Sequence, residues 1–167
     1  LQAKFDTRKL RKALQPVLTT KTLGSDALKT GLAICAKRID TGAAWVLTNN
    51  PNSLYHDPPA DSGTYPNKRY RLIDLVLASA AAPTFFDEIV IDIEFDDKNK
   101  VIQQGYFVDG AVGANNNPSF QLFMLALEPS FRLADERAEL RSPYMEARGF
   151  WSLHAVPLRV ALTRSED

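Results

Sequence analysis

The chain has 167 residues, of which 45% are hydrophobic and 24% are charged. This length suits one soluble domain that buries about 70% of its unfolded surface. The 20 basic and 20 acidic residues cancel. The chain therefore lacks the positive charge that drives non-specific nucleic-acid binding, and we expect no nucleic-acid partner. A single cysteine excludes an internal disulfide and, with only two histidines, argues against a closed zinc site. We expect neither a metal nor an organic cofactor.

The most apolar stretch, Leu75 to Phe86, is interrupted by Pro83 and falls short of the ~20 residues that span a bilayer. The first dozen residues are basic, but no apolar run follows them, so they are not a secretion signal. We therefore expect a cytoplasmic protein. Contact of this basic segment with anionic lipid headgroups is an alternative to an ordinary charged solvent face. Because the chain starts with Leu1, we expect a processed protein, a truncated form or a fragment.

The first predicted element is a helix in which Leu10, Leu14 and Val17 recur with helical spacing, capped by Asp6 or Thr7. A buried strand is then expected over residues 31–39. After the turn Asp40-Thr41-Gly42, a second strand over residues 44–48 forms its hairpin partner. Residues 49–69 are rich in proline and asparagine, which predicts a long surface loop.

The second half repeats this mixture of helix and strand. A helix is expected over 72–81, and two strands over 89–95 and 101–108 are joined by a solvated hairpin tip. A helix over 120–127 is apolar nearly all round, which predicts that it is buried. Less regular patterns suggest an exposed helix over 132–148 and a last strand over 158–162. Because strands and helices interleave, we expect an α/β or α+β protein with a mixed sheet.

The strongest candidate for chemistry is Asp109. It stands where an apolar strand ends and a glycine-containing turn begins, in the run Asp109-Gly110-Ala111. Active sites of α/β proteins lie at the carboxyl ends of strands, so the carboxylate could serve as a base. The competing interpretation is that Asp-Gly is an ordinary turn dipeptide. Local sequence alone leaves both open.

Several blocks of the sequence stand in a particular order: Ala78-Ser-Ala-Ala-Ala-Pro-Thr-Phe-Phe86, Phe107-Val-Asp-Gly-Ala111 and Asn116-Asn-Pro118, with Lys29-Thr-Gly-Leu-Ala-Ile34 and Asp40-Thr-Gly42 upstream. Together these blocks resemble the patatin-like phospholipase family, in particular its bacterial members. The resemblance runs from about residue 5 to about residue 128. It implies a three-layer α/β sandwich that hydrolyses acyl esters of lipids with a Ser–Asp dyad. It further implies that Asp109 is the dyad base, with Gly110 and Ala111 as its turn motif.

The chain also departs from the family pattern. None of its eight glycines is followed two positions later by serine, and there is no run of three glycines. The nucleophile elbow and the oxyanion loop are therefore missing from these 167 residues. We expect the C-terminal part of a patatin-like domain, matching over 1–128 and divergent over 129–167, which is inactive alone and self-associates. The alternative is a non-catalytic relative that binds a protein or a lipid.

The remaining reactive side chains have simpler explanations. His56 and His154 are expected at the surface or an interface. Ser79 is expected to serve packing, and Cys35 to be a buried small residue.

Overall fold

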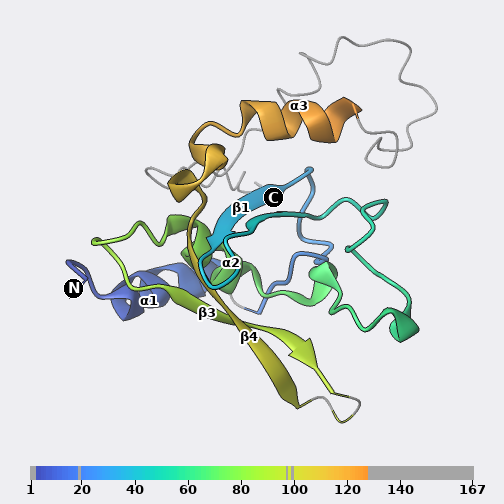
Figure 1. The fold of residues 1–167 in the computed structure, drawn as a ribbon, viewed down its shortest axis with the longest axis horizontal. Helices are drawn as coiled ribbons and strands as arrows, with labels where there is room; N and C mark the ends of the chain where they lie inside the picture. The colour runs from blue at the N-terminus through green and yellow to red at the C-terminus, as the bar shows by residue number, and fades with distance from the viewer. Residues whose placement is uncertain (1–2, 19, 97, 99, 128–167) are drawn as a thin grey trace, which may run out of the picture.

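A computed structural model describes residues 3–18, 20–96, 98 and 100–127 (Figure 1). Its centre is a four-stranded sheet in the order β2-β1-β4-β3. The strands are β1 (Ala33–Arg38), β2 (Ala44–Thr48), β3 (Ile89–Phe95) and β4 (Val101–Asp109). Each lies where the hydrophobic pattern predicts a strand, so the α/β class is confirmed.

The described sheet is antiparallel throughout, whereas we expected a mixed one. The reason lies in the connections. A tight turn with Gly42 at φ +75° joins β1 to β2, and a hairpin tip joins β3 to β4. Hairpins make neighbouring strands antiparallel, because a parallel pair needs a long crossover connection. The two hairpins then meet through β1 and β4, which also run in opposite directions.

Two helices build the core against one face of this sheet. Helix α2 (Leu72–Ala80) packs on β1, β3 and β4, and α1 (Thr7–Leu18) packs on α2. Most of the side chains of α2 are buried, and each large aliphatic one stabilises the fold by about 1.5–3 kcal/mol relative to full exposure. Below them lie the inward-facing residues of the strands, among them Ile34, Leu47 and Phe107.

Helix α1 begins as its sequence predicts, because the Asp6 carboxylate accepts the backbone N–H of Arg8 at 2.9 Å. It ends one residue later than its apolar spacing suggests. Leu18 is buried and Val17 is 38% exposed, since Leu18 lies one turn beyond the buried Leu14. Pro16 is accommodated inside this last turn.

Helix α3 (Ser119–Leu127) forms where predicted, and Asn117 caps it by accepting the backbone N–H of Ser119 at 3.1 Å. Its predicted burial is wrong for the side chains that the structure describes. Phe120 is 66% exposed and Met124 is 46% exposed, and the helix lies beyond one end of the sheet, away from α1 and α2 (Figure 1). An apolar composition shows that a helix can be buried, but not that a partner covers it.

The segment between β2 and α2 is the predicted loop, with two short 3-10 turns at Ala60–Ser62 and Asn67–Arg69. The elements expected over 132–148 and 158–162 lie outside the described residues. Within the described residues, no helix is both long and apolar enough to cross a membrane.

Candidate active site

Asp109 is the last residue of β4 and lies opposite Ala36 of β1 in the strand register. Only 6% of its surface is exposed. Its backbone N–H donates to the carbonyl of Ala81 at 3.0 Å. Ala81 directly follows α2, so this hydrogen bond ties the end of the strand to the end of the helix. The carboxylate therefore starts from a fixed backbone position.

The carboxylate of Asp109 is only partly engaged by its surroundings. Oδ1 accepts the backbone N–H of Ala111 at 2.8 Å, which is the bond expected of an aspartate that opens a turn. Oδ2 has no hydrogen-bond partner among the described residues. One oxygen thus organises the turn, and the other has lone pairs left to accept a proton. The structure therefore shows the turn role of Asp109, and Oδ2 remains available for a further contact.

The turn after Asp109 needs a glycine first. A Cβ at Gly110 would lie 2.8 Å from the backbone oxygen of Cys35, which is closer than real Cβ contacts allow. Residues Gly110–Val112 form a 3-10 turn, closed by a hydrogen bond from Gly113 N–H to the Gly110 carbonyl at 3.1 Å. Ala111 contributes its backbone amide to the Asp109 carboxylate. In this turn, Gly110 therefore allows the backbone to lie close to Cys35, and Ala111 donates one amide hydrogen bond to the carboxylate.

The segment after α2 brings small residues close to this turn. Ala78 and Ala81 are almost completely buried, which lets the helix end lie against β4. Thr84, three residues further on, has φ +73°, a left-handed conformation that is unusual for a residue other than glycine. Ser79 is half-buried and makes no hydrogen bond to Asp109. Its expected packing role stays a prediction.

A residue that the sequence analysis gave no role lies just beyond the turn. Asn115 is 6% exposed, and its side-chain oxygen is buried without a hydrogen-bond partner in the described part of the chain. Such groups are uncommon in folded proteins. The sequence offered only one signal, an asparagine six positions after the aspartate of the turn.

The other candidate nucleophile or base groups lie elsewhere. Cys35 sits on β1 next to Ala36, the partner of Asp109, so its side chain is on the opposite face of the sheet. Burial raises the pKa of its thiol, which disfavours the reactive thiolate. His56 is 9% exposed, with Nδ1 unpartnered among the described residues. It was expected at the surface or an interface, and its side chain is buried within the 49–69 loop. His154 lies outside the described residues.

A cavity of about 440 Å³ opens at the other end of the sheet, under the 49–69 loop. Its walls include Arg38, Trp45, Tyr65, Tyr70 and Gln103. Burial raises the pKa of Tyr70. Asp109 does not line this cavity. Arg38, which does line it, pairs in the strand register with Phe107, two residues before Asp109 on β4.

The arrangement of acids and histidines does not suggest a metal centre. Among the residues that the structure describes, no three His, Cys, Asp or Glu side chains are grouped so that they could hold an ion. The site therefore consists of one carboxylate, its turn and the end of α2. A buried carboxylate with one oxygen left for a further partner is compatible with several roles, proton transfer among them.

The family described as "Patatin-like phospholipase" matches residues 1–122, which include β1 to β4, α2 and the Asp109 turn. No individual curated protein matches the chain. The match covers well over half of the sequence. The chain therefore belongs to the patatin-like phospholipase family.

Proposed function

We propose that the chain provides the base half of a Ser–Asp dyad that hydrolyses acyl esters of lipids. The observation that supports the proposal is the Asp109 carboxylate, which is buried at the end of β4 and, among the described residues, has a hydrogen bond only at Oδ1. Membership in a family of lipid acyl hydrolases indicates the reaction class. The nucleophilic serine comes from a segment outside these 167 residues, because no Gly-x-Ser-x-Gly occurs in them.

In the proposed reaction, the serine oxygen attacks the ester carbonyl carbon while Asp109 Oδ2 accepts the serine proton. Backbone amides stabilise the oxyanion of the tetrahedral intermediate. Collapse of this intermediate breaks the bond to the alcohol, which leaves with the proton held by Asp109. Water then attacks the acyl-serine with the same carboxylate as base, which releases the fatty acid and restores the serine. Each cycle thus consumes one water and one ester.

The first test uses the 167-residue chain alone with p-nitrophenyl butyrate. We expect no hydrolysis above background, since the loss of one oxyanion donor alone costs about 10²–10³ in rate and the loss of the nucleophile costs more. The polypeptide of the whole open reading frame is then assayed with Asp109→Asn and with the exposed acid Asp61→Asn as control. Asp109→Asn is expected to lower kcat by at least about 10³-fold and Asp61→Asn to leave it unchanged. Turnover by the isolated chain that Asp109→Asn abolishes would refute the proposal.

The second candidate is a non-catalytic relative that binds a protein or a lipid. The absence of a serine elbow from the sequence favours it. A whole-frame polypeptide that hydrolyses no ester would decide for this alternative.

We also propose that the chain self-associates. Strands β2 and β3 are the outer strands of the described sheet, and α3 exposes Phe120 and Met124. Unpaired strand edges and exposed apolar side chains favour contact with a second copy. Sedimentation velocity is expected to show a species heavier than the monomer as concentration rises. A single monomer boundary at the highest concentration would contradict this.

A further inference from the structure

Two phenylalanines lie side by side on the surface near the start of the chain. Phe5 is 48% exposed and Phe85 is 45% exposed. Their rings stack with centroids 6.1 Å apart, and the ring of Phe86 lies 5.7 Å from that of Phe5. Clustered exposed aromatic rings differ from the single apolar residues that every protein surface carries. Such a group indicates a surface that contacts another molecule.

The backbone holds this aromatic group in place. The N–H of Lys4 donates to the carbonyl of Thr84 at 2.9 Å, and the N–H of Phe5 donates to the carbonyl of Phe85 at 2.8 Å. The segment before α1 is thus paired with the segment after α2. The rings form a defined platform and do not belong to a loose chain end.

Basic side chains adjoin the platform. Lys4 Nζ lies 5.6 Å from the ring centroids of both Phe5 and Phe85. Lys9 and Lys12 are exposed on α1, on the side opposite the buried Leu14, and no ion pair engages them within the described residues. The nearby cation Arg8 is neutralised by Asp6 at 3.0 Å.

Two acids also belong to this region. Asp87 and Glu88 are exposed directly after Phe86. They offset part of the charge of Lys4, Lys9 and Lys12 but leave an excess of positive charge. An excess of cations around exposed aromatic rings is the pattern of a surface that inserts into the headgroup boundary of a bilayer. Each lysine near an anionic membrane adds to this attraction.

The platform also lies close to the candidate base. Phe85 and Phe86 both donate their N–H to the carbonyl of Ala82, at 3.1 and 3.0 Å, and the preceding residue, Ala81, accepts the N–H of Asp109. Figure 1 places the start of α1 and the chain before β3 on the same side of the molecule. A lipid surface bound there would lie near the end of the strand that carries Asp109.

We propose that Phe5, Phe85, Lys4, Lys9 and Lys12 form an interfacial surface that seats the chain on an anionic phospholipid bilayer. The proposal rests on the lipid substrate of the proposed function and names the surface by which that substrate is reached. The rings enter the boundary between headgroups and acyl chains, and the ammonium groups contact the anionic headgroups. We refer to these five residues as the platform surface.

The test measures cosedimentation of the full chain with vesicles of phosphatidylcholine, with and without phosphatidylserine. The double variant Phe5→Ser/Phe85→Ser is expected to lose at least about tenfold in partition coefficient. The control is Leu54→Ser, which changes an 80% exposed residue in the distant 49–69 loop and should bind like the parent. Circular dichroism and the urea midpoint confirm that each variant is folded.

A charge-reversal pair tests the electrostatic part. Lys9→Glu/Lys12→Glu is expected to remove the preference for phosphatidylserine, by at least about tenfold. Lys29→Glu/Lys100→Glu changes the net charge equally at two exposed lysines outside the platform surface and should keep the preference.

No binding to either vesicle, or equal binding by the Phe5/Phe85 and Leu54 variants, overturns the proposal. Loss of self-association in the Phe5/Phe85 variant without any vesicle binding also overturns it, since the surface is then a protein contact. These binding measurements do not depend on catalytic activity. If the surface fails while the whole-frame polypeptide still depends on Asp109 for ester hydrolysis, the platform surface is wrong and the dyad stands.

Discussion

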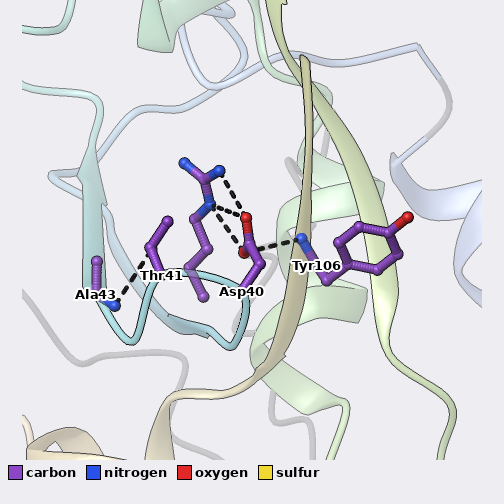
Figure 2. Close-up of polar contacts among 5 residues, drawn as sticks. Asp40, Thr41, Ala43 and Tyr106 are labelled. Atoms are coloured by element: carbon purple, nitrogen blue, oxygen red, sulfur yellow. Dashed lines mark hydrogen bonds and ion pairs between the residues drawn. The ribbon is translucent and has the colours of Figure 1, made fainter.

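Two buried charged groups occupy different positions on the central sheet and are treated differently by the fold. Arg38 on β1 is 8% exposed, and Asp109 on β4 is 6% exposed. The Arg38 guanidinium donates three hydrogen bonds to the Asp40 carboxylate, at 2.7 to 2.9 Å, and lies over the ring of Trp45. Asp40 also accepts the N–H of Tyr106 at 3.4 Å (Figure 2). Within the part of the chain that the structure describes, the Asp109 carboxylate accepts one hydrogen bond, from the turn amide of Ala111.

The two groups differ in how many hydrogen bonds the described residues supply to them. Arg38 is fully paired with Asp40, whereas Asp109 can accept further hydrogen bonds. A buried charge is costly unless it is paired and hydrogen-bonded. The Arg38–Asp40 pair satisfies this condition within the chain. Asp109 satisfies it in part and keeps one oxygen without a hydrogen-bond partner among the described residues. Burial alone therefore does not distinguish the two groups, but the number of their partners does.

The largest effect is expected where the Asp109 turn approaches β1. Gly110→Val places a Cβ 2.8 Å from the Cys35 carbonyl oxygen and should lower the free energy of unfolding by about 2–3 kcal/mol. The control is Gly113→Ala, whose Cβ would lie at an ordinary 3.6 Å from the nearest atom and should change stability by less than about 0.5 kcal/mol. Urea unfolding measures both. Equal losses of unfolding free energy in the two variants would mean that the contact between Gly110 and Cys35 does not restrict the side chain at position 110.

A smaller effect should distinguish the two carboxylates directly. Asp40→Asn removes the charge that pairs with buried Arg38 and is expected to destabilise the fold. Asp109→Asn keeps an oxygen for the Ala111 amide and removes a buried, half-paired charge, so stability is expected to stay equal or rise. Chemical denaturation at neutral pH compares the two variants. A large loss in Asp109→Asn would make that carboxylate structural.

The same comparison has a defined pH dependence. Hydrogen bonds from Arg38 lower the pKa of Asp40 below its ordinary 3.8. A lowered folded-state pKa contributes stability above the ordinary value, and this contribution is lost as the pH falls through the folded-state pKa. The difference between the parent and Asp40→Asn should therefore be full near neutral pH and shrink below about pH 4. A constant difference down to the acid limit would exclude the ion pair as its cause.

Local sequence pattern predicted the parts of the fold that local physics determines. The apolar runs around Gly42 and the tip after Phe95 specify hairpins, and Asp109 follows from its place between an apolar strand and a Gly turn. Helix α2 is equally clear, because its apolar residues and Pro83 mark both its face and its end.

The rest depends on contacts between distant segments. Three features follow from tertiary packing, which periodicity does not encode. They are the pairing of Phe5 with Phe85, the burial of His56 and the exposure of Phe120. The Arg38–Asp40 pair is close in sequence, yet nothing in the pattern distinguishes it from a solvated pair. Nothing in the sequence pattern shows that the side-chain oxygen of Asn115 is buried without a hydrogen-bond partner among the described residues.

The hydrogen bond between Asp109 N–H and the Ala81 carbonyl makes the position of the carboxylate depend on the length of a helix. One residue added within α2 would rotate that carbonyl by about 100° around the helix axis and advance it by about 1.5 Å. A change far from the aspartate in sequence would thus withdraw its backbone anchor. The number of residues between Leu72 and Ala81 is thus part of what places the carboxylate.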